Sequence, residues 1–444
     1  MLKVGLFAVL LTSVGLKLLL DYDFDLESPK FEKDDFFGEG EIHADDEKIH
    51  DFTIAVDRER VEDLKNRVKL GKQRLQKQLE DTDFEFGFSA NYLKNLTEAW
   101  LKYDWKQHET EIEGLLIHFV RTNYPSKNNE KKIPILLIHG YPSSFWDFYK
   151  VIPILANPGR FGFDFGSKGS IVFDVVVPSI PGFGFSEKPQ KKGFGFIECA
   201  RSYAKLMSRL GHKKFFVFGS GELGVETATA LTLLAPEAVQ GLQVVNPWIS
   251  PFQDAQIFVK SLISSFVPSL YLGENEKPVR IADYLDKFSY FWTMKSRPDS
   301  LSVAVNDSPL GLAAWLLDRF ALGVKENFAK HPQGWLQNSF TVDELLTEVH
   351  LYWFTETFPH AARFFKNSYG HPLFEVTIRA PVNTSTAIIT LPASSISSPR
   401  HLLDHCFRNI VRYTVGNKEG DFAPLRDHRL VAEEIFAFVE EIVG

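Results

Sequence analysis

Phe215-Phe-Val-Phe-Gly-Ser-Gly-Glu-Leu-Gly224 is the stretch of sequence that decides the fold. An apolar run enters a tight glycine turn, and an apolar stretch with helical length follows at residues 225–234. This order is typical of a nucleophile elbow, in which the turn lifts one side chain above a sheet at a helix N-terminus that favours negative charge. When the elbow motif is aligned with this stretch, Glu222 occupies the position at the tip of the turn. Ser220 lies two residues earlier and residue 218 is Phe, so the G-x-S-x-G pattern of a serine hydrolase is not met.

Short apolar runs repeat along the rest of the chain, separated by stretches with helical spacing. They are rich in β-branched and aromatic residues, and such runs between helices are typical of a parallel sheet with both faces covered. The sequence therefore predicts an α/β protein with strands near residues 115–120, 133–138, 171–177, 215–218, 242–245, 387–391 and 413–415.

Another predicted strand ends in a glycine turn, Ile138-His-Gly-Tyr-Pro142. Such a turn can aim backbone N–H groups into a pocket, as an oxyanion hole requires. The expected donors are the backbone N–H groups of Tyr141 and Leu223. His139 is either structural or catalytic, and its place in the turn favours the structural role.

The last predicted strand is followed by Gly416-Asn-Lys-Glu-Gly-Asp-Phe422. In hydrolases with an elbow of this kind the catalytic His comes last in the chain, but this turn contains none. His428 lies seven residues beyond Asp421, within or beside a predicted closing helix. There a solvent-facing position is favoured over a catalytic one.

Several long motifs follow one another along the chain: Phe88-Ser-Ala-Asn-Tyr-Leu-Lys94, Ile112-Glu-Gly-Leu-Leu-Ile-His-Phe119, His139-Gly-Tyr-Pro142, Phe148-Tyr-Lys-Val-Ile-Pro153, Pro178-Ser-Ile-Pro-Gly-Phe-Gly-Phe-Ser186, Arg297-Pro-Asp299 and Asn306-Asp-Ser-Pro-Leu-Gly-Leu-Ala-Ala314. On these motifs the chain, from about residue 52 to its C-terminus, resembles the microsomal epoxide hydrolases, including the juvenile hormone epoxide hydrolase branch. One family segment ahead of Ile112 is shortened, because Trp105-Lys-Gln-His108 runs almost directly into Glu111.

The resemblance implies a two-step mechanism that needs five side chains. An elbow Asp attacks an epoxide carbon while two Tyr hydroxyls donate to the opening oxygen, and a His oriented by an acid then activates the water that hydrolyses the ester. Carried over position by position, the nucleophile becomes Glu222, the acid Ser394 and the His Asp421. Tyr290 retains the first Tyr, and Phe365 replaces the second. One of the five side chains is kept.

These replacements predict a catalytically inactive protein that keeps a ligand pocket. Glu222 is one methylene longer than Asp, and Phe365 lacks a proton donor whose loss costs roughly 3 kcal/mol in comparable sites. The alternative is a one-step reaction in which Glu222 and Asp421 face each other, one activating water while the other, protonated, donates to the epoxide oxygen. Residual activity by the ordinary route, or another chemistry, also stays open.

The resemblance implies an α/β-hydrolase fold with a mostly parallel, eight-stranded-type sheet, an inserted helical lid and an N-terminal helical extension. Residues 57–79 have the spacing of an amphipathic helix, and residues 21–48 are acidic, aperiodic and expected to form a tether. The expected divisions are 1–20 for a membrane anchor or signal segment, 21–110 for the N-terminal extension, 111–246 and 371–444 for the hydrolase core, and 247–370 for the lid.

Composition restricts the partners. A net charge of −8 argues against nucleic acid. The two cysteines, Cys199 and Cys406, form at most one bridge and no zinc site, and the resemblance implies neither a cofactor nor a metal. The lid aromatics suggest an apolar small-molecule ligand or epoxide, although core packing explains them equally well. These are Phe288, Tyr290, Phe291, Trp292, Trp315, Trp353 and Phe354. The oligomeric state stays open.

Residues 4–20 form an apolar stretch interrupted only by Thr12, Ser13 and Lys17. A spanning helix needs about 20 residues, so the stretch is short, yet Leu18–Leu20 extend it and Lys17 can reach the interface. An uncleaved membrane anchor is favoured. A cleaved signal peptide, with secretion or a lumenal location, and a buried helix are the alternatives. With the family, an anchor implies the endoplasmic reticulum or microsomal membrane.

Overall fold

The computed structural model describes residues 29–52, 57–76, 78, 82, 84–85, 87–93, 107–122, 131–161, 171–250, 255–267, 272, 288–325, 327–392, 394, 397–418 and 420–444. The segment predicted as an anchor or signal peptide lies outside these residues. Within the described ranges, no helix combines the length and apolarity that crossing a membrane requires.

The core of the molecule is a nine-stranded sheet with the order β1-β2-β3-β5-β4-β6-β7-β8-β9. Strands β4 to β9 pair in parallel, whereas β1, β2 and β3 extend the sheet in antiparallel fashion beside β5. The predicted mostly parallel sheet is confirmed, and each predicted strand coincides with one of β3 to β9. The strands are β1 (His50–Phe52), β2 (Gln107–Ile112), β3 (Leu115–Arg121), β4 (Lys131–Ile138), β5 (Ile171–Pro178), β6 (Phe215–Ser220), β7 (Val239–Val245), β8 (Thr386–Thr390) and β9 (Ile410–Val415).

Alternation along the strands divides the apolar side chains between two cores. In β6, Phe215 and Val217 belong to one cluster of buried residues, whereas Phe216 and Phe218 belong to the other. Successive strand side chains point to opposite faces, so a strand that is apolar at every position must be covered on both. All six residues of β6 are buried.

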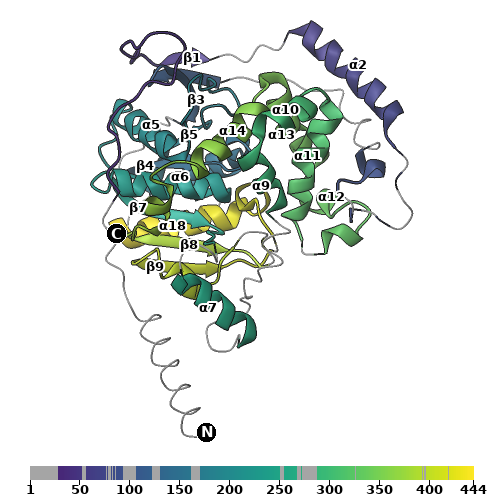
Figure 1. The fold of residues 1–444 in the computed structure, drawn as a ribbon. Helices are drawn as coiled ribbons and strands as arrows, with labels where there is room; N and C mark the ends of the chain where they lie inside the picture. Colours follow the sequence, from purple (N-terminus) through teal and green to yellow (C-terminus); the bar gives the residue numbers. More distant parts are fainter. Residues whose placement is uncertain are drawn as a thin grey trace, which may run out of the picture.

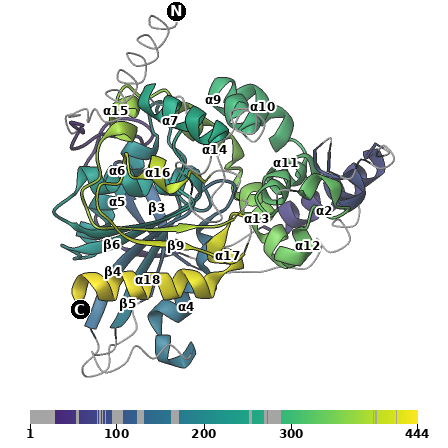
Figure 2. The ribbon, with the colours of Figure 1, turned by 90° about the horizontal axis from the view of Figure 1, so that it is seen from below.

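Helices cover both faces of the sheet. Figure 2 shows α5 (Phe196–Arg209) and α6 (Gly221–Leu234) on one side of the strands, and α4 (Val151–Ala156) and α18 (His428–Val443) on the other. The inward-facing residues of α18, among them Val431 and Ile435, join the second core. This layering holds the carboxyl ends of β4 and β6 at one edge, which is where open α/β sheets place their ligand sites.

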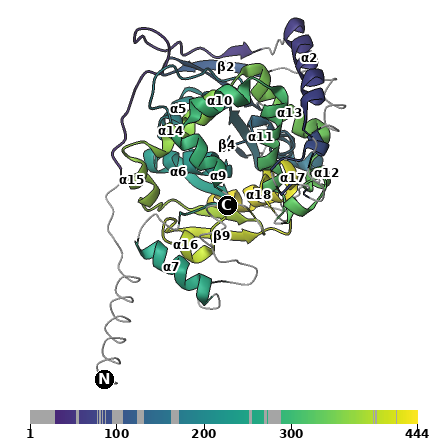
Figure 3. The same cartoon turned by 45° about the vertical axis from the view of Figure 1, so that its right-hand side comes forward.

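A long helical insertion separates β7 from β8. It contains α7 (Ala255–Phe266), α9 (Ser289–Ser296), α10 (Pro298–Asn306), α11 (Pro309–Leu322), η5 (Phe328–Lys330), α12 (Leu336–Ser339), α13 (Val342–Thr355), α14 (Phe358–Tyr369) and α15 (Phe374–Arg379). Apart from α7 and α15, these helices form a group beside the sheet, green in Figures 1 and 3. Shorter elements elsewhere are η1 (Phe145–Phe148), η2 (Pro158–Phe161), α16 (Arg400–Leu403) and α17 (Ala423–Arg426).

The N-terminal segment differs in part from its prediction. The expected amphipathic helix is α2 (Arg58–Arg74), which begins at an Asp57 cap and buries Leu64 and Val68. The expectation of a tether is wrong for the described part, because Phe36 and Phe37 are buried. The backbone N–H of Phe37 donates to the carbonyl of Glu113 at 2.9 Å. Two adjacent aromatic side chains therefore dock an otherwise acidic segment onto the sheet.

Candidate active site

The turn between β6 and α6 is tight because glycines from two strand ends meet there. Gly221 has a φ of 68°, a left-handed conformation that glycine adopts without strain. A Cβ on Gly140, at the end of β4, would lie 2.6 Å from the carbonyl oxygen of Ser220. Glu222 follows in the first turn of α6 and is only 1% exposed. The structure thus places Glu222 where the elbow motif predicts the nucleophile position.

Tyr290 reaches Glu222 from the helical insertion. Its hydroxyl donates to Oε1 of Glu222 at 2.5 Å. Burial raises the pKa of Glu222, and the charge of Asp421 adds to that rise, while Arg319 and the Tyr290 hydrogen bond oppose it. Tyr290 is itself buried, which raises its pKa well above the ordinary value. The predicted electrophile and the predicted nucleophile position are therefore in direct contact.

Phe365, which the sequence predicts at the position of the second Tyr, packs beside Tyr290 and Tyr141. Its ring centroid lies 6.3 Å from that of Tyr290 and 5.3 Å from that of Tyr141, and its side chain is fully buried. Tyr141 receives a hydrogen bond from Nε1 of Trp315 at 2.8 Å. Residue 365 contributes apolar packing at this position and no hydroxyl.

Asp421 and Ser394 are also brought together. The hydroxyl of Ser394 donates to Oδ1 of Asp421. The same oxygen accepts a hydrogen bond from Nδ2 of Asn246 at 3.0 Å, at the carboxyl end of β7. The two residues at the predicted acid and His positions are thus neighbours, but a neutral hydroxyl and an acceptor have replaced an acid and a base.

Arg319 is a site residue that the sequence analysis did not indicate. It projects from α11, is 5% exposed, and its guanidinium lies 4.1 Å from the ring centroid of Tyr290. Burial lowers its pKa, but the charges of Tyr290, Glu222 and Asp421 outweigh burial, and the net shift is upward. Its Nε and Nη1 atoms are buried and have no hydrogen-bond partner among the residues that the structure describes. The charge of Arg319 therefore balances part of the charge of two buried carboxyl groups.

Glu222, Asp421 and Arg319 line one small cavity. Its volume is about 20 Å³, which is room for about one water molecule. The other described residues that line it are Tyr141, Ser143, Asp147, Ser220, Gly221, Val245, Asn246 and Phe422. None of the described residues in this lining is a histidine, so they offer no neutral imidazole base of the kind that the family mechanism uses.

A second pair of acids, one of which lines this cavity, was also not predicted from the sequence. Asp147, in η1, and Glu348, in α13, are both buried. Burial raises the pKa of Asp147 to about 7, and burial together with the charge of Asp147 raises the pKa of Glu348 well above its ordinary value. Two carboxyl groups in this setting stay at least partly protonated at neutral pH.

The two histidines considered from the sequence do not join the site. His139 is buried, and its Nε2 accepts a hydrogen bond from the backbone N–H of Ile180 at 3.1 Å. Burial lowers the pKa of His139 to about 4, which suits a neutral structural ring. His428 begins α18 and lines a different depression, beside Tyr149 and Phe161. The backbone N–H groups of Tyr141 and Leu223 remain predicted oxyanion donors, on residues that are both buried.

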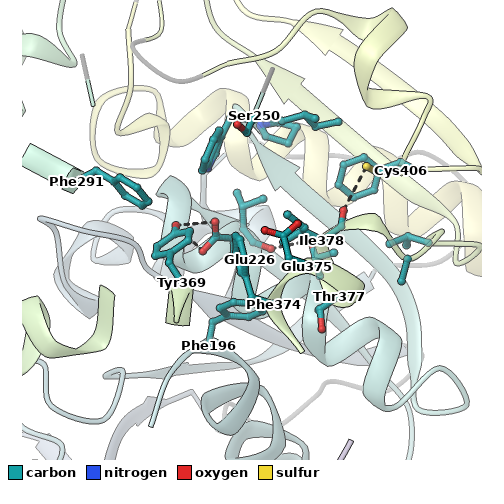
Figure 4. A pocket seen from close by; sticks show the side chains of 18 of the residues that line it. Phe196, Glu226, Ser250, Phe291, Tyr369, Phe374, Glu375, Thr377, Ile378 and Cys406 are labelled. Carbon is teal, nitrogen blue, oxygen red and sulfur yellow. Dashed lines mark hydrogen bonds between the residues drawn. The ribbon is translucent and has the colours of Figure 1, made fainter. Parts of the chain in front are cut away.

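A larger cavity lies one helical turn beyond Glu222. Its volume is about 220 Å³, and Glu226 of α6 projects into it (Figure 4). The hydroxyl of Tyr369 donates to both carboxyl oxygens of Glu226, at 2.7 and 2.8 Å. Burial raises the pKa of Glu226 to about 8, with the charge of Glu222 adding to the rise and the Tyr369 hydrogen bond opposing it.

The raised pKa of Glu226 predicts a pH-dependent stability. A carboxyl group with a folded-state pKa above its ordinary value stabilises the fold at low pH, and this contribution is lost as pH rises through the folded-state pKa. The shift corresponds to about 3 to 5 kcal/mol between pH 4.5 and pH 8. We therefore expect Glu226→Gln to be more stable than the wild type at pH 8, with a difference that shrinks towards pH 5. Urea denaturation at several pH values measures it. The exposed Glu375→Gln is the control and should show a flat difference; a flat difference for Glu226→Gln would contradict the prediction.

The fold and the elbow define an α/β-hydrolase. Residues 49–148 match the family described as epoxide hydrolase N terminus, and residues 133–293 match the α/β hydrolase fold. The chain is 32% identical over 418 residues to epoxide hydrolase 1 of Sus scrofa, covering 89% of each chain. It is 31% identical to juvenile hormone epoxide hydrolase 2 of Ctenocephalides felis, covering 97% of this chain and 94% of the relative. The chain belongs to the epoxide hydrolase family.

Solved structures agree on the fold. Juvenile hormone epoxide hydrolase from Bombyx mori superposes with a TM-score of 0.84 at 24% identity, covering 93% of this chain and 99% of the other. The epoxide hydrolase of Aspergillus niger gives a TM-score of 0.68, also at 24% identity, over 89% and 97% of the two chains. The resemblance inferred from the motifs is confirmed at the level of family and fold.

Proposed function

We propose that this protein is an epoxide hydrolase homologue that has lost the two-step hydrolysis and binds a small apolar molecule. The observation that carries the proposal concerns the residue at the position predicted for the catalytic His. This residue is Asp421, and its side chain accepts hydrogen bonds from Asn246 and Ser394, so no acid–His pair is formed by these residues. An ester formed on Glu222 would have no neutral imidazole beside it to activate the hydrolytic water.

The electrophilic half of the mechanism is weakened as well. Phe365 cannot donate to an opening epoxide oxygen. The hydroxyl of Tyr290 donates to Glu222, so the one retained donor is engaged by the group that would have to attack. Arg319 adds a nearby cation that stabilises ionised carboxylates and thereby makes them poorer nucleophiles. These three features act in the same direction, against ester formation.

A binding role is supported by the space that remains beside the elbow. The cavity around Glu226 has a volume of about 220 Å³, and most of its lining side chains are apolar or aromatic. The curated relatives are named as hydrolases of epoxides, so an apolar molecule of modest size is the ligand class that the family background favours. Binding, sensing and regulation are all compatible with such a pocket.

The alternative is an active enzyme with a two-carboxylate site. The specific observation in its favour is that the charge of Asp421 contributes to the raised pKa of Glu222. One carboxylate would take a proton from water as that water attacks the epoxide carbon, and the other, protonated, would donate to the ring oxygen as the C–O bond breaks. No covalent intermediate forms in this route.

Diol formation by the purified protein tests both proposals. We expect no turnover of styrene oxide or of a long-chain alkyl epoxide above the buffer rate. Robust wild-type turnover that Glu222→Gln abolishes would reject the inactive assignment and support the two-carboxylate route. Arg363→Met is a suitable matched control, because Arg363 lies on an exposed face and pairs with Asp299.

The proposed location is the cytosolic face of the endoplasmic reticulum membrane, held by the N-terminal segment. Three N-x-Ser/Thr triplets, at Asn95, Asn306 and Asn383, then stay unglycosylated. Asn383 is the best reporter because it is exposed, whereas Oδ1 of Asn306 is buried. We expect unchanged electrophoretic mobility after glycosidase treatment, and retention in the membrane fraction after carbonate washing. A mobility shift that Asn383→Gln removes, or release by carbonate, would count against this location.

A further inference from the structure

We propose that the cavity around Glu226 is a binding site for a small lipophilic amine, whose ammonium group pairs with Glu226 while its apolar body occupies the cavity. This inference deepens the proposed binding role and rests on it. The juxtaposition that carries it is a carboxyl group, that of Glu226 beside Tyr369, inside a mainly apolar cavity (Figure 4). Three aromatic rings of the lining lie near the ammonium group of Lys295.

The inner end of the cavity is acidic. Glu226 is held by Tyr369, whose hydroxyl donates to both of its carboxyl oxygens. The described groups that shift the pKa of Glu226 are Tyr369 and Glu222, and neither is a cation. Glu226 is partly buried, and a carboxylate withdrawn from water is costly without a counter-charge, so a ligand ammonium would supply the partner that these described neighbours do not.

The rim of the cavity already accommodates an ammonium group. Nζ of Lys295 lies 5.8 Å from the ring centroid of Phe291, 5.5 Å from that of Trp292 and 5.9 Å from that of Tyr369. Rings that surround a cation in this way attract it through their negative faces. The cavity lining thus offers aromatic faces of the kind that attract an ammonium group, while the charge of Lys295 opposes the approach of a second one. Glu375, which also lines the cavity, pairs with Arg379 at 2.9 Å.

The aromatic side chains that line the cavity around Glu226 indicate the shape of the apolar part of the ligand. Phe196, Trp248, Phe374 and Phe407 line the cavity around Glu226, and they offer flat surfaces to an aromatic or branched body. A cavity of about 150 Å³ holds benzene, so 220 Å³ accommodates one ring with a short chain. Phenethylamine has this size and carries its ammonium two carbons from the ring.

Other ligand classes fit less well. A carboxylate ligand would bring a negative charge towards Glu226, with Glu222 one helical turn away. A neutral alcohol can exchange a hydrogen bond with Glu226 but brings no counter-charge. The amine alone uses the carboxyl group, the aromatic rim and the apolar walls together.

Binding of the amine is expected to depend on pH in a particular direction. Two described titratable groups act directly on the carboxyl group of Glu226, namely Glu222 and Tyr369. The other charged or titratable residues that line the cavity are Lys295, Glu375 and Cys406. Since Glu226 has a pKa of about 8, it must release its proton before it pairs with an ammonium. The affinity for the amine should therefore rise about tenfold per pH unit between pH 6 and pH 8, and it should level off above pH 8.

Calorimetric titration of the full-length protein with phenethylamine, beside its neutral isostere 2-phenylethanol, tests the proposal. We expect the amine to bind at least about tenfold more tightly than the alcohol at pH 8. Glu226→Gln should abolish that preference, whereas Glu237→Gln, at an exposed position outside the cavity lining, should keep it. Loss of the preference in Glu226→Gln is not a folding defect if the variant keeps its thermal midpoint.

Equal affinity for amine and alcohol in the wild type, or a preference that survives Glu226→Gln, would overturn the amine site. The diol assay reports on the proposed function separately. Epoxide turnover together with amine selectivity would reject the inactive assignment but support the amine site. Absence of both turnover and amine selectivity would support the inactive assignment but reject the amine site.

Discussion

Epoxide hydrolysis is expected to rise at least about a hundredfold above the wild-type background when four substitutions are combined: Glu222→Asp, Asp421→His, Ser394→Glu and Phe365→Tyr. The scaffold supports this gain because the four positions already lie together. The hydroxyl of Ser394 contacts Asp421, and the ring of Phe365 packs beside that of Tyr290. The combined variant therefore rebuilds nucleophile, base, orienting acid and second donor around an unchanged elbow.

Each of the four substitutions alone should change the rate by less than about threefold, because members of such a catalytic unit act together. A His at residue 421 would lie near Arg319, whose charge keeps the imidazole neutral and thus able to act as a base. The diol assay with styrene oxide measures the gain. The control places Asn, in place of Asp, at residue 222 in the combined variant and should return the rate to background. If the combined variant folds but hydrolyses styrene oxide no faster than the wild type, the four replaced side chains do not account for the absence of activity.

Removal of Arg319 is expected to give the largest loss of stability. Arg319→Met removes a buried cation whose charge acts on the buried carboxyl groups of both Glu222 and Asp421, and removing one partner of a buried charge pair costs about 3 to 5 kcal/mol. Urea denaturation at pH 7 measures the loss. Arg363→Met removes an equally long cation from an exposed pair and should cost less than about 1 kcal/mol.

A double-substitution cycle separates the charge effect of Arg319 from its packing. In a Glu222→Gln background, Arg319→Met should cost clearly less than in the wild type, because one of the two charges that it balances is gone. The cost should also fall at lower pH, since the raised pKa of Glu222 lets that group take up a proton first. An equal cost in both backgrounds would show that Arg319 acts through packing alone.

Much of the fold was predictable because its signals are local. The apolar runs of β3 to β9 are short, rich in β-branched residues and separated by helical spacing, and the glycine turn at residues 219–224 marks the elbow. The edge strand β1 and its neighbour β2 were missed because His50–Phe52 and Gln107–Ile112 are mostly polar. Their pairing depends on the neighbouring strand and not on their own side chains.

The candidate site was predictable only where motif order could be carried over. Glu222, Ser394 and Asp421 were placed by their positions after strands, and the structure brings Ser394 and Asp421 into contact. Arg319 carries no such signal. It sits in an apolar helix 97 residues beyond Glu222, and its approach depends on how the insertion packs. The Glu226–Tyr369 contact spans 143 residues and was missed for the same reason.

The central claim is that Glu222 does not act as the nucleophile of a two-step hydrolysis. Intact-mass spectrometry of the purified protein after incubation with excess styrene oxide tests this claim most directly. The family route must pass through an ester on the elbow carboxylate, and this ester would accumulate because Asp421 is poorly suited to activate the water that hydrolyses it. We predict that the protein keeps its unmodified mass throughout. A mass increase equal to one epoxide, located on the peptide that contains Glu222 and absent from Glu222→Gln, would contradict the claim.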